Sequence, residues 1–424
     1  MSETELLSAG DCRALVSAYL GPNPAARVVS VDVRPLAGPR AGYMSDHLRV
    51  ELVVQEGSSP PRQLRFFAKS LPRVQVHREY VASTRFYVKE TAFYARLLKE
   101  MRDAQGDGGH DRWVPASYLV REDLIVLEDL SLQNYRPFSA REVMDVATSQ
   151  LVLGEMARFH AATLVLEEKN RASGETRTLK EMYPDMLEER SGSTLRMEGK
   201  LGWFPAAVRC ILKLMDHIPK YNTDATKLQS IKDKIPEVCQ VMNTIVNSSS
   251  KFRNVVCHAD IWASNILLRY SEDNKPFDVR FVDFQLVRYA PPACDVITFL
   301  FLLTDKTFRE NHSQYLITHY YDKFAEELCR RNLDPEKLFP KSEFEESCEY
   351  YNILGVILAP VALPMLLLPP EVVDEHFRTP ERFVQFMLED RSTECVDYYH
   401  SNAEFRQRIC DIIEEFVESC ILEK

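Results

Sequence analysis

Two short segments in the second half of the chain decide its fold. Val256–Leu268 reads VCHADIWASNILL, and Arg280–Gln285 reads RFVDFQ. The first has the form H-x-D-x-x-x-x-N and runs into apolar residues, and the second is an apolar stretch that ends in Asp-Phe. We expect a strand, a loop and further short strands here. The polar side chains of Asp260, Asn265 and Asp283 would then lie in one region.

These residue types suit phosphoryl transfer from a nucleotide. Such a transfer needs a carboxylate beside the acceptor hydroxyl, and oxygen ligands that hold Mg²⁺ against the phosphates. Asp260 is the candidate catalytic base, and Asn265 and Asp283 are the candidate metal ligands. Each of them alone would more often be a turn or cap residue. Their joint order on one strand–loop–strand unit favours the functional interpretation.

The first 130 residues or so are expected to form a sheet around a long helix. A helical period of apolar residues runs from His77 to Met101. The turn Gly38–Ser45 occupies the place of a phosphate-covering loop between two strands, with an ordinary hairpin turn as the alternative. Alternating and apolar runs predict strands at Arg27–Leu36, His47–Gln55, Gln63–Ser70, Ala116–Val120 and Leu124–Leu127.

This first part also holds candidate nucleotide-binding residues. Lys69 ends the third predicted strand and can reach phosphates if a carboxylate fixes it. Glu90, in the long helix, is the candidate partner, although Lys69 could be a surface lysine and Glu90 a solvated residue paired with its neighbour Lys89. The last strand of this part ends in a segment that can offer backbone N–H and C=O groups to an adenine edge, formed by Glu128, Asp129 and Leu130.

The chain from residue 139 onward is mainly helical in pattern. Ser139 and Glu142 form a capping-box signature, which predicts a helix towards Glu168. Further helices are expected around 203–218, 224–245, 308–332, 341–368 and 402–422. The uncharged run Ile353–Pro370 has the bare length of a membrane span, but three prolines interrupt it. We therefore predict buried helix pieces that line an apolar cavity.

Composition excludes several classes of protein. The net charge of the 424 residues is −11 and the chain has no Lys/Arg run, so we expect no nucleic-acid partner. The ten cysteines are scattered without a C-x-x-C pair, which favours reduced thiols and a cytoplasmic protein over a disulfide scaffold or a zinc site. The N-terminus is not typical of a signal peptide.

The motifs together resemble the ecdysteroid-kinase-like (EcKinase, CHK kinase-like) family, which is related to choline kinases and aminoglycoside phosphotransferases. The resemblance implies an α+β, bilobal, protein-kinase-like fold with a β-rich lobe over residues 1–130 and a helical lobe over 131–424. It implies ATP and Mg²⁺ as cofactors, and a role for Asp295 in bracing the catalytic loop. The residues that carry it are Leu127–Leu130, Arg158–Ala161, His258, Asp260, Trp262, Asn265, Asp283–Gln285 and Asp295.

The expected activity is transfer of the γ-phosphoryl group of ATP to a hydroxyl of an apolar small-molecule alcohol, such as an ecdysteroid or a xenobiotic. A role in detoxification would follow from the second kind of acceptor. Two alternatives stay open. One is a kinase-like module that binds a nucleotide without catalysis, and the other is a kinase of the choline or aminoglycoside type.

Overall fold

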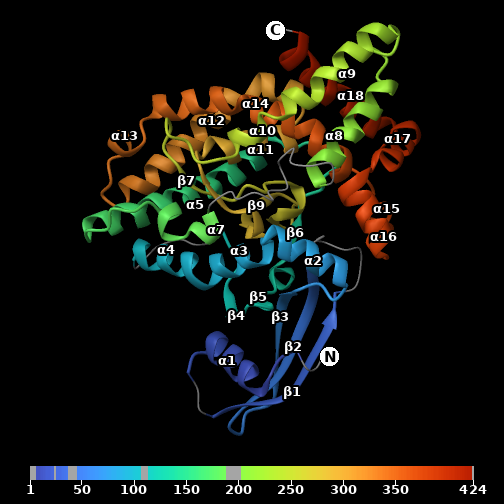
Figure 1. The fold of residues 1–424 in the computed structure, drawn as a ribbon. Coiled ribbons are helices and arrows are strands. Elements are labelled where there is room, and N and C mark those ends of the chain that lie inside the picture. Colours follow the sequence, from blue (N-terminus) through green and yellow to red (C-terminus); the bar gives the residue numbers. More distant parts are fainter. Residues whose placement is uncertain (1–5, 23–24, 37–44, 107–112, 188–201, 423–424) are drawn as a thin grey trace.

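The structure is a computed structural model that describes residues 6–22, 25–36, 45–106, 113–187 and 202–422. It has the expected α+β architecture with two lobes. A small lobe built on a sheet lies below a large helical lobe in Figure 1, and the helices that follow β3 run between them. The predicted phosphate-covering loop at Gly38–Ser45 lies outside the described residues except for Ser45.

The small lobe is a five-stranded antiparallel sheet in the order β1-β2-β3-β5-β4. One face, with Val50 and Phe66 among its buried side chains, packs against Leu15 of helix α1 (Ala9–Leu20). The opposite face looks towards the large lobe and carries Lys69. The strands are β1 (Ala26–Pro35), β2 (Asp46–Glu56), β3 (Arg62–Ser70), β4 (Ser117–Val120) and β5 (Leu124–Glu128).

The long helix predicted from His77 to Met101 is broken. Arg85 has a φ of 60° and its N–H donates to the carbonyl of Ala82, so it closes one helix in the left-handed conformation before the next begins. The break redirects the chain, and the second segment carries Glu90 to Lys69. The segments are α2 (Gln75–Thr84), α3 (Phe86–Ala92), a π-helical turn (Phe93–Leu97) and α4 (Leu98–Gln105).

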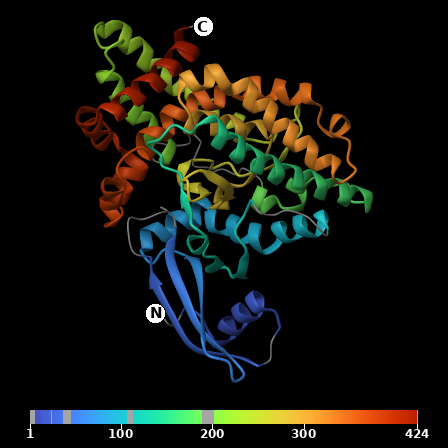
Figure 2. The same cartoon turned by 180° about the vertical axis from the view of Figure 1, so that it is seen from behind.

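The large lobe is helical around two small sheets. Strand β7 (Val255–Cys257) pairs with β10 (Arg288–Ala290), and β8 (Ile266–Tyr270) lies between β6 (Tyr135–Pro137) and β9 (Pro276–Phe281). Figure 2 shows this lobe from behind. Its helices are α5 (Val146–Ala172), α6 (Leu179–Met182), α7 (Pro184–Leu187), α8 (Trp203–Leu214), α9 (Ala225–Cys239), α10 (Met242–Ile245), α11 (Ala293–Leu303), α12 (Lys306–Cys329), α13 (Pro335–Leu338), α14 (Lys341–Leu366), α15 (Pro370–His376), α16 (Pro380–Val384), α17 (Ser392–Ser401) and α18 (Ala403–Val417).

The helix start predicted at Ser139 is wrong. Helix α5 begins at Val146, where the side chain of Asp145 accepts a hydrogen bond from Thr148 N at 2.7 Å. The N–H of Met144 donates to the carbonyl of Leu303, which ties the preceding segment to the end of α11 and keeps it out of the helix. The carboxylate cap nearer the apolar run therefore prevails over the serine.

Most of the apolar run, from Ile353 to Leu366, is one continuous part of α14, which ends before Pro369. The helix passes through Pro360 and Pro364. Among the described residues it is the one helix with the length and apolar character to cross a membrane, and 72% of its most apolar window is buried inside the protein. At Gly355 it packs directly against α11, so this part of the run is helical core.

Gly355→Ala should destabilise the protein. A Cβ at this position would overlap the ring of Phe301 and lie 2.8 Å from Ile297 Cγ2. Overpacking of a buried site typically costs about 1–3 kcal/mol, which outweighs the gain of about 1 kcal/mol from replacing a helical glycine. Urea unfolding measures the change in the free energy of unfolding.

Gly154→Ala in α5 is the matched control, because its Cβ would meet its nearest neighbours, His319 and Lys323, at an ordinary 3.9 Å. It should leave stability unchanged or raise it. Equal stability of the two variants would contradict the close packing of α14 against α11.

Candidate active site

A buried ion-pair cluster joins the two lobes at Lys69. Its Nζ lies 2.6 Å from Glu90 Oε2 and 2.6 Å from Asp283 Oδ1. The three residues come from the end of β3, from α3 and from the segment after β9. Lys89, the alternative partner of Glu90, instead donates to the carbonyl of Val287. The structure therefore brings together three residues that the sequence assigned to one site, while their roles stay a prediction.

The electrostatics of this cluster follow from burial and charge. Burial opposes the charge of Lys69, but the carboxylates of Asp283 and Glu90 outweigh it and raise the pKa of the lysine. Burial also raises the pKa of Glu90 to about 7, against the stabilising charge of Lys69. One oxygen of Glu90, Oε1, is buried without a hydrogen-bond partner among the described residues. The cluster thus contains two carboxylates and one lysine.

Two further candidate residues, Asp260 and Asn265, lie together in the segment between β7 and β8. The side-chain amide of Asn265 donates to both Oδ2 and the backbone carbonyl of Asp260, each at 3.0 Å. Because its nitrogen is used, the amide oxygen of Asn265 remains for a metal ion. That oxygen and the Asp283 carboxylate are hard oxygen ligands of the kind that Mg²⁺ prefers, so the donor set fits the ion.

Asp260 itself is half-buried. Burial and the nearby charge of Asp283 raise its pKa to about 7, while side-chain hydrogen bonds from Gln285 and Asn265 pull in the opposite direction. A carboxylate with a pKa near neutral pH is suited to accept a proton. Gln285 belongs to the Asp283–Gln285 motif on which the family resemblance rests, and its contact with Asp260 is a feature that spacing alone did not reveal.

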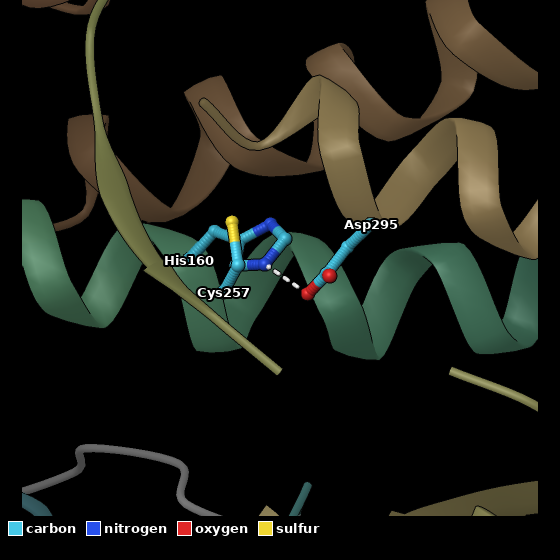
Figure 3. Close-up of side chains that lie close together, drawn as sticks. All are labelled: His160, Cys257 and Asp295. Atoms are coloured by element: carbon cyan, nitrogen blue, oxygen red, sulfur yellow. Dashed lines mark hydrogen bonds and ion pairs between the residues drawn. The ribbon is translucent and has the colours of Figure 1, made fainter. Parts of the chain in front are cut away.

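A buried carboxylate holds the loop that carries Asp260. Asp295, in the first turn of α11, accepts the backbone N–H groups of His258 at 2.6 Å and Ala259 at 2.9 Å. His160 of α5 lies 3.1 Å from the same carboxylate, as Figure 3 shows. These contacts fix the loop at Ala259, whose φ of 63° is in the left-handed region.

His160, Cys257 and Asp295 form a cluster with the spacing of metal ligands among the described residues, although no such cluster is visible from sequence spacing. All three are buried and already bonded within the protein. The other ring nitrogen of His160 lies 2.7 Å from Tyr320 Oη, and the Cys257 thiol donates to the carbonyl of Ala290. We therefore assign the cluster to bracing the loop.

A cavity of about 290 Å³ between the lobes collects most of the candidate residues. Lys69, Glu90, Asn265 and Asp283 line one part of it, and the end of β5 lines another. Asp260 is not among its lining residues and adjoins the cavity through Asn265. The floor on the side of the large lobe includes Leu267 and Val282.

The segment at the end of β5 lines the cavity with Glu128, Asp129 and Leu130. The Glu128 carboxylate is bonded to Gln133, and the Asp129 carboxylate accepts from Arg65 Nε at 2.6 Å. Both charged side chains are thus engaged within the protein. A base in the cavity would meet the backbone here and the apolar side chain of Leu130.

The roof of the cavity was missed at the sequence level. Leu36, His47, Arg49 and Phe67 line it from β2, β3 and the residue after β1. Strand alternation carried a signal for these residues. His47 and Arg49 are two residues apart on β2 and share a face, as Phe67 and Lys69 do on β3.

The model of the ecdysteroid kinase-like family matches residues 39–333. Among solved structures, the chain is similar to the ethanolamine kinase of Plasmodium vivax, at 12% sequence identity and a TM-score of 0.36, over 89% of this chain and 83% of that chain. The curated proteins give no match.

Asp295→Asn should destabilise the protein by about 2–4 kcal/mol, because an amide nitrogen in place of one oxygen would face buried N–H donors. The free energy of unfolding in urea measures this loss. Asp145→Asn, at the exposed cap of α5, is the control and should change stability by less than about 0.5 kcal/mol because asparagine caps helices equally well. A tolerated Asp295→Asn would show that the carboxylate does not brace the loop.

Proposed function

The chain belongs to the ecdysteroid kinase-like family, and from this premise we propose that it is a small-molecule kinase that transfers the γ-phosphoryl group of ATP to a hydroxyl, with Mg²⁺ as cofactor. The observation that carries the proposal is the contact of Lys69 with both Glu90 and Asp283 in a cavity that Asn265 also lines. A phosphate-binding lysine and two oxygen ligands for a metal thus converge on one cleft.

The residues divide into those that bind and those that act on the acceptor. Lys69, oriented by Glu90, binds the phosphates of the nucleotide. Asn265 and Asp283 would hold Mg²⁺, which when bound neutralises phosphate charge. The adenine base of ATP lies between the roof and the floor of the cavity, next to Leu130.

Asp260 acts at the acceptor. Its carboxylate orients the substrate hydroxyl and accepts the proton as the hydroxyl oxygen forms a bond to the γ-phosphorus. The bond between that phosphorus and the β,γ-bridging oxygen breaks, and its electron pair leaves with ADP. The hydrogen bonds from Asn265 and Gln285 keep the carboxylate in place for this step.

The acceptor that we propose is an apolar alcohol, either an ecdysteroid or a xenobiotic, and the second kind would make the reaction part of detoxification. The family to which the chain belongs supports this choice. The apolar run of α14 adds no support, because at Gly355 it is packed against α11. We also propose a cytoplasmic location, which is supported by the ten cysteines, all among the described residues, because none of them forms a disulfide.

Asp260→Asn should lower turnover by about 10²–10⁴-fold, since a positioned general base contributes about that factor. Binding of ATP should change little because Asp260 lies outside the cavity lining. The measurement is the rate of phosphate transfer from labelled ATP to a panel of steroid and xenobiotic alcohols. Asp273→Asn, in the exposed turn between β8 and β9, is the control and should match the wild type. Near-wild-type turnover of Asp260→Asn would refute its role.

ATP should raise the thermal unfolding temperature of the wild type only when Mg²⁺ is present. Saturation to about 100 times the dissociation constant stabilises a protein by about 2.7 kcal/mol. Asp283→Asn should lose most of this stabilisation because it replaces a charged metal ligand by a neutral amide. No effect of ATP on the wild type would contradict nucleotide binding altogether. Stabilisation without transfer to any alcohol in the panel would favour the non-catalytic module.

A further inference from the structure

We propose that Arg49 is a further binding residue of the nucleotide site, which stacks its guanidinium group on the purine base beneath the sheet. The inference rests on the proposed function, since it assumes that the cavity between the lobes binds a nucleotide. It adds a residue on the N-terminal side of the sheet that no motif of the sequence marks.

The register of the sheet places Arg49 in a row of side chains above the base. Arg49 of β2 pairs with Phe67 of β3, which pairs with Leu127 of β5. Residues directly opposite one another in antiparallel strands point to the same face. Arg49, Phe67 and Leu127 all line the cavity, so the row forms a continuous surface of cation, aromatic ring and leucine.

Two other arginines on this face of the sheet pair with carboxylates, and Arg49 does not do so within the described residues. Arg34, its neighbour on β1, lies 3.0 Å from Glu51, and Arg65 lies 2.6 Å from Asp129. Within the described part of the chain, no carboxylate lies within ion-pair distance of Arg49. Its Nε is buried and lacks a hydrogen-bond partner there. A half-buried cation that the protein does not neutralise is suited to contact a ligand.

The position of Arg49 along its strand places it beside the purine base of the nucleotide and not beside the phosphates. Lys69 pairs with His47, one same-face row away from the pair of Phe67 and Arg49. Two residues of a strand span about 6.8 Å, so the row of Arg49 and Phe67 lies about that far along the sheet from the row of His47 and Lys69. A planar guanidinium stacks favourably on an aromatic face, and a purine presents such a face.

The two walls of the cavity suit a flat ring. Phe67 and Arg49 lie on the side of the sheet, and Leu267 and Val282 lie on the side of the large lobe. The ring of His47 meets Phe67 edge-on, with centroids 5.1 Å apart, and holds it in the roof. A base between these walls would be covered on both faces, with its edge towards the end of β5.

The test compares dissociation constants of adenosine, AMP and Mg·ATP for the wild type and Arg49→Met, measured by calorimetry. Stacking predicts that the variant weakens all three by the same factor, about 3- to 30-fold. A loss that appears only with the phosphates, or grows with their number, would overturn stacking. Unchanged binding of all three would also overturn it.

Two further variants complete the experiment. Arg34→Met removes a cation from the same row outside the cavity and should bind all three ligands like the wild type. Arg49→Lys keeps the charge and the apolar stem but not the plane, so it should recover only part of the loss, and full recovery would overturn stacking. If the wild type binds none of the ligands, the proposed function fails. If the wild type binds and Arg49→Met equals it, only this inference fails.

Discussion

The arrangement of the two lobes depends on the burial of one cation. Lys69 is 5% exposed, and an unpaired ammonium at that depth would cost several kcal/mol. The protein satisfies it with Glu90 from α3 and Asp283 from the large lobe. The sheet, the helix and the segment after β9 therefore have to meet at one point. The left-handed break at Arg85 serves this requirement, because it redirects the helix that carries Glu90.

A second constraint acts on the loop that carries Asp260, and it comes from α11. Ala259 adopts a left-handed conformation that costs an alanine about 1–2 kcal/mol. The carboxylate of Asp295 accepts hydrogen bonds from this residue and from His258. These charge-assisted bonds offset the strain and hold the loop that carries Asp260. The methyl group of Ala259 is thus tolerated because α11 fixes the backbone.

The sequence predicted features that local spacing encodes and missed those that depend on distant segments. Asp260, Asn265 and Asp283 were found because they lie on one strand–loop–strand unit. The contact of Lys69 with Glu90 was expected only because a lysine at a strand end needs a carboxylate. Nothing local signalled the break at Arg85, since a left-handed arginine has no sequence signature. Period-two alternation from Lys69 would have found Phe67, but Arg49 lies on another strand, and its place opposite Phe67 depends on the register of the sheet.

The charge balance of the cleft explains why a nucleotide would enter it with a divalent cation. Lys69 carries one positive charge, and Glu90 and Asp283 carry two negative charges when ionised, so the cluster repels a triphosphate. Burial raises the pKa of Glu90 to about 7, and the negative charge of Asp283 adds to this rise. Mutual repulsion with Asp283 likewise adds to the raised pKa of Asp260. Two positive charges held by Asn265 and Asp283 would reverse the sign of the cluster, and the same residues that exclude a bare triphosphate would then bind its magnesium complex.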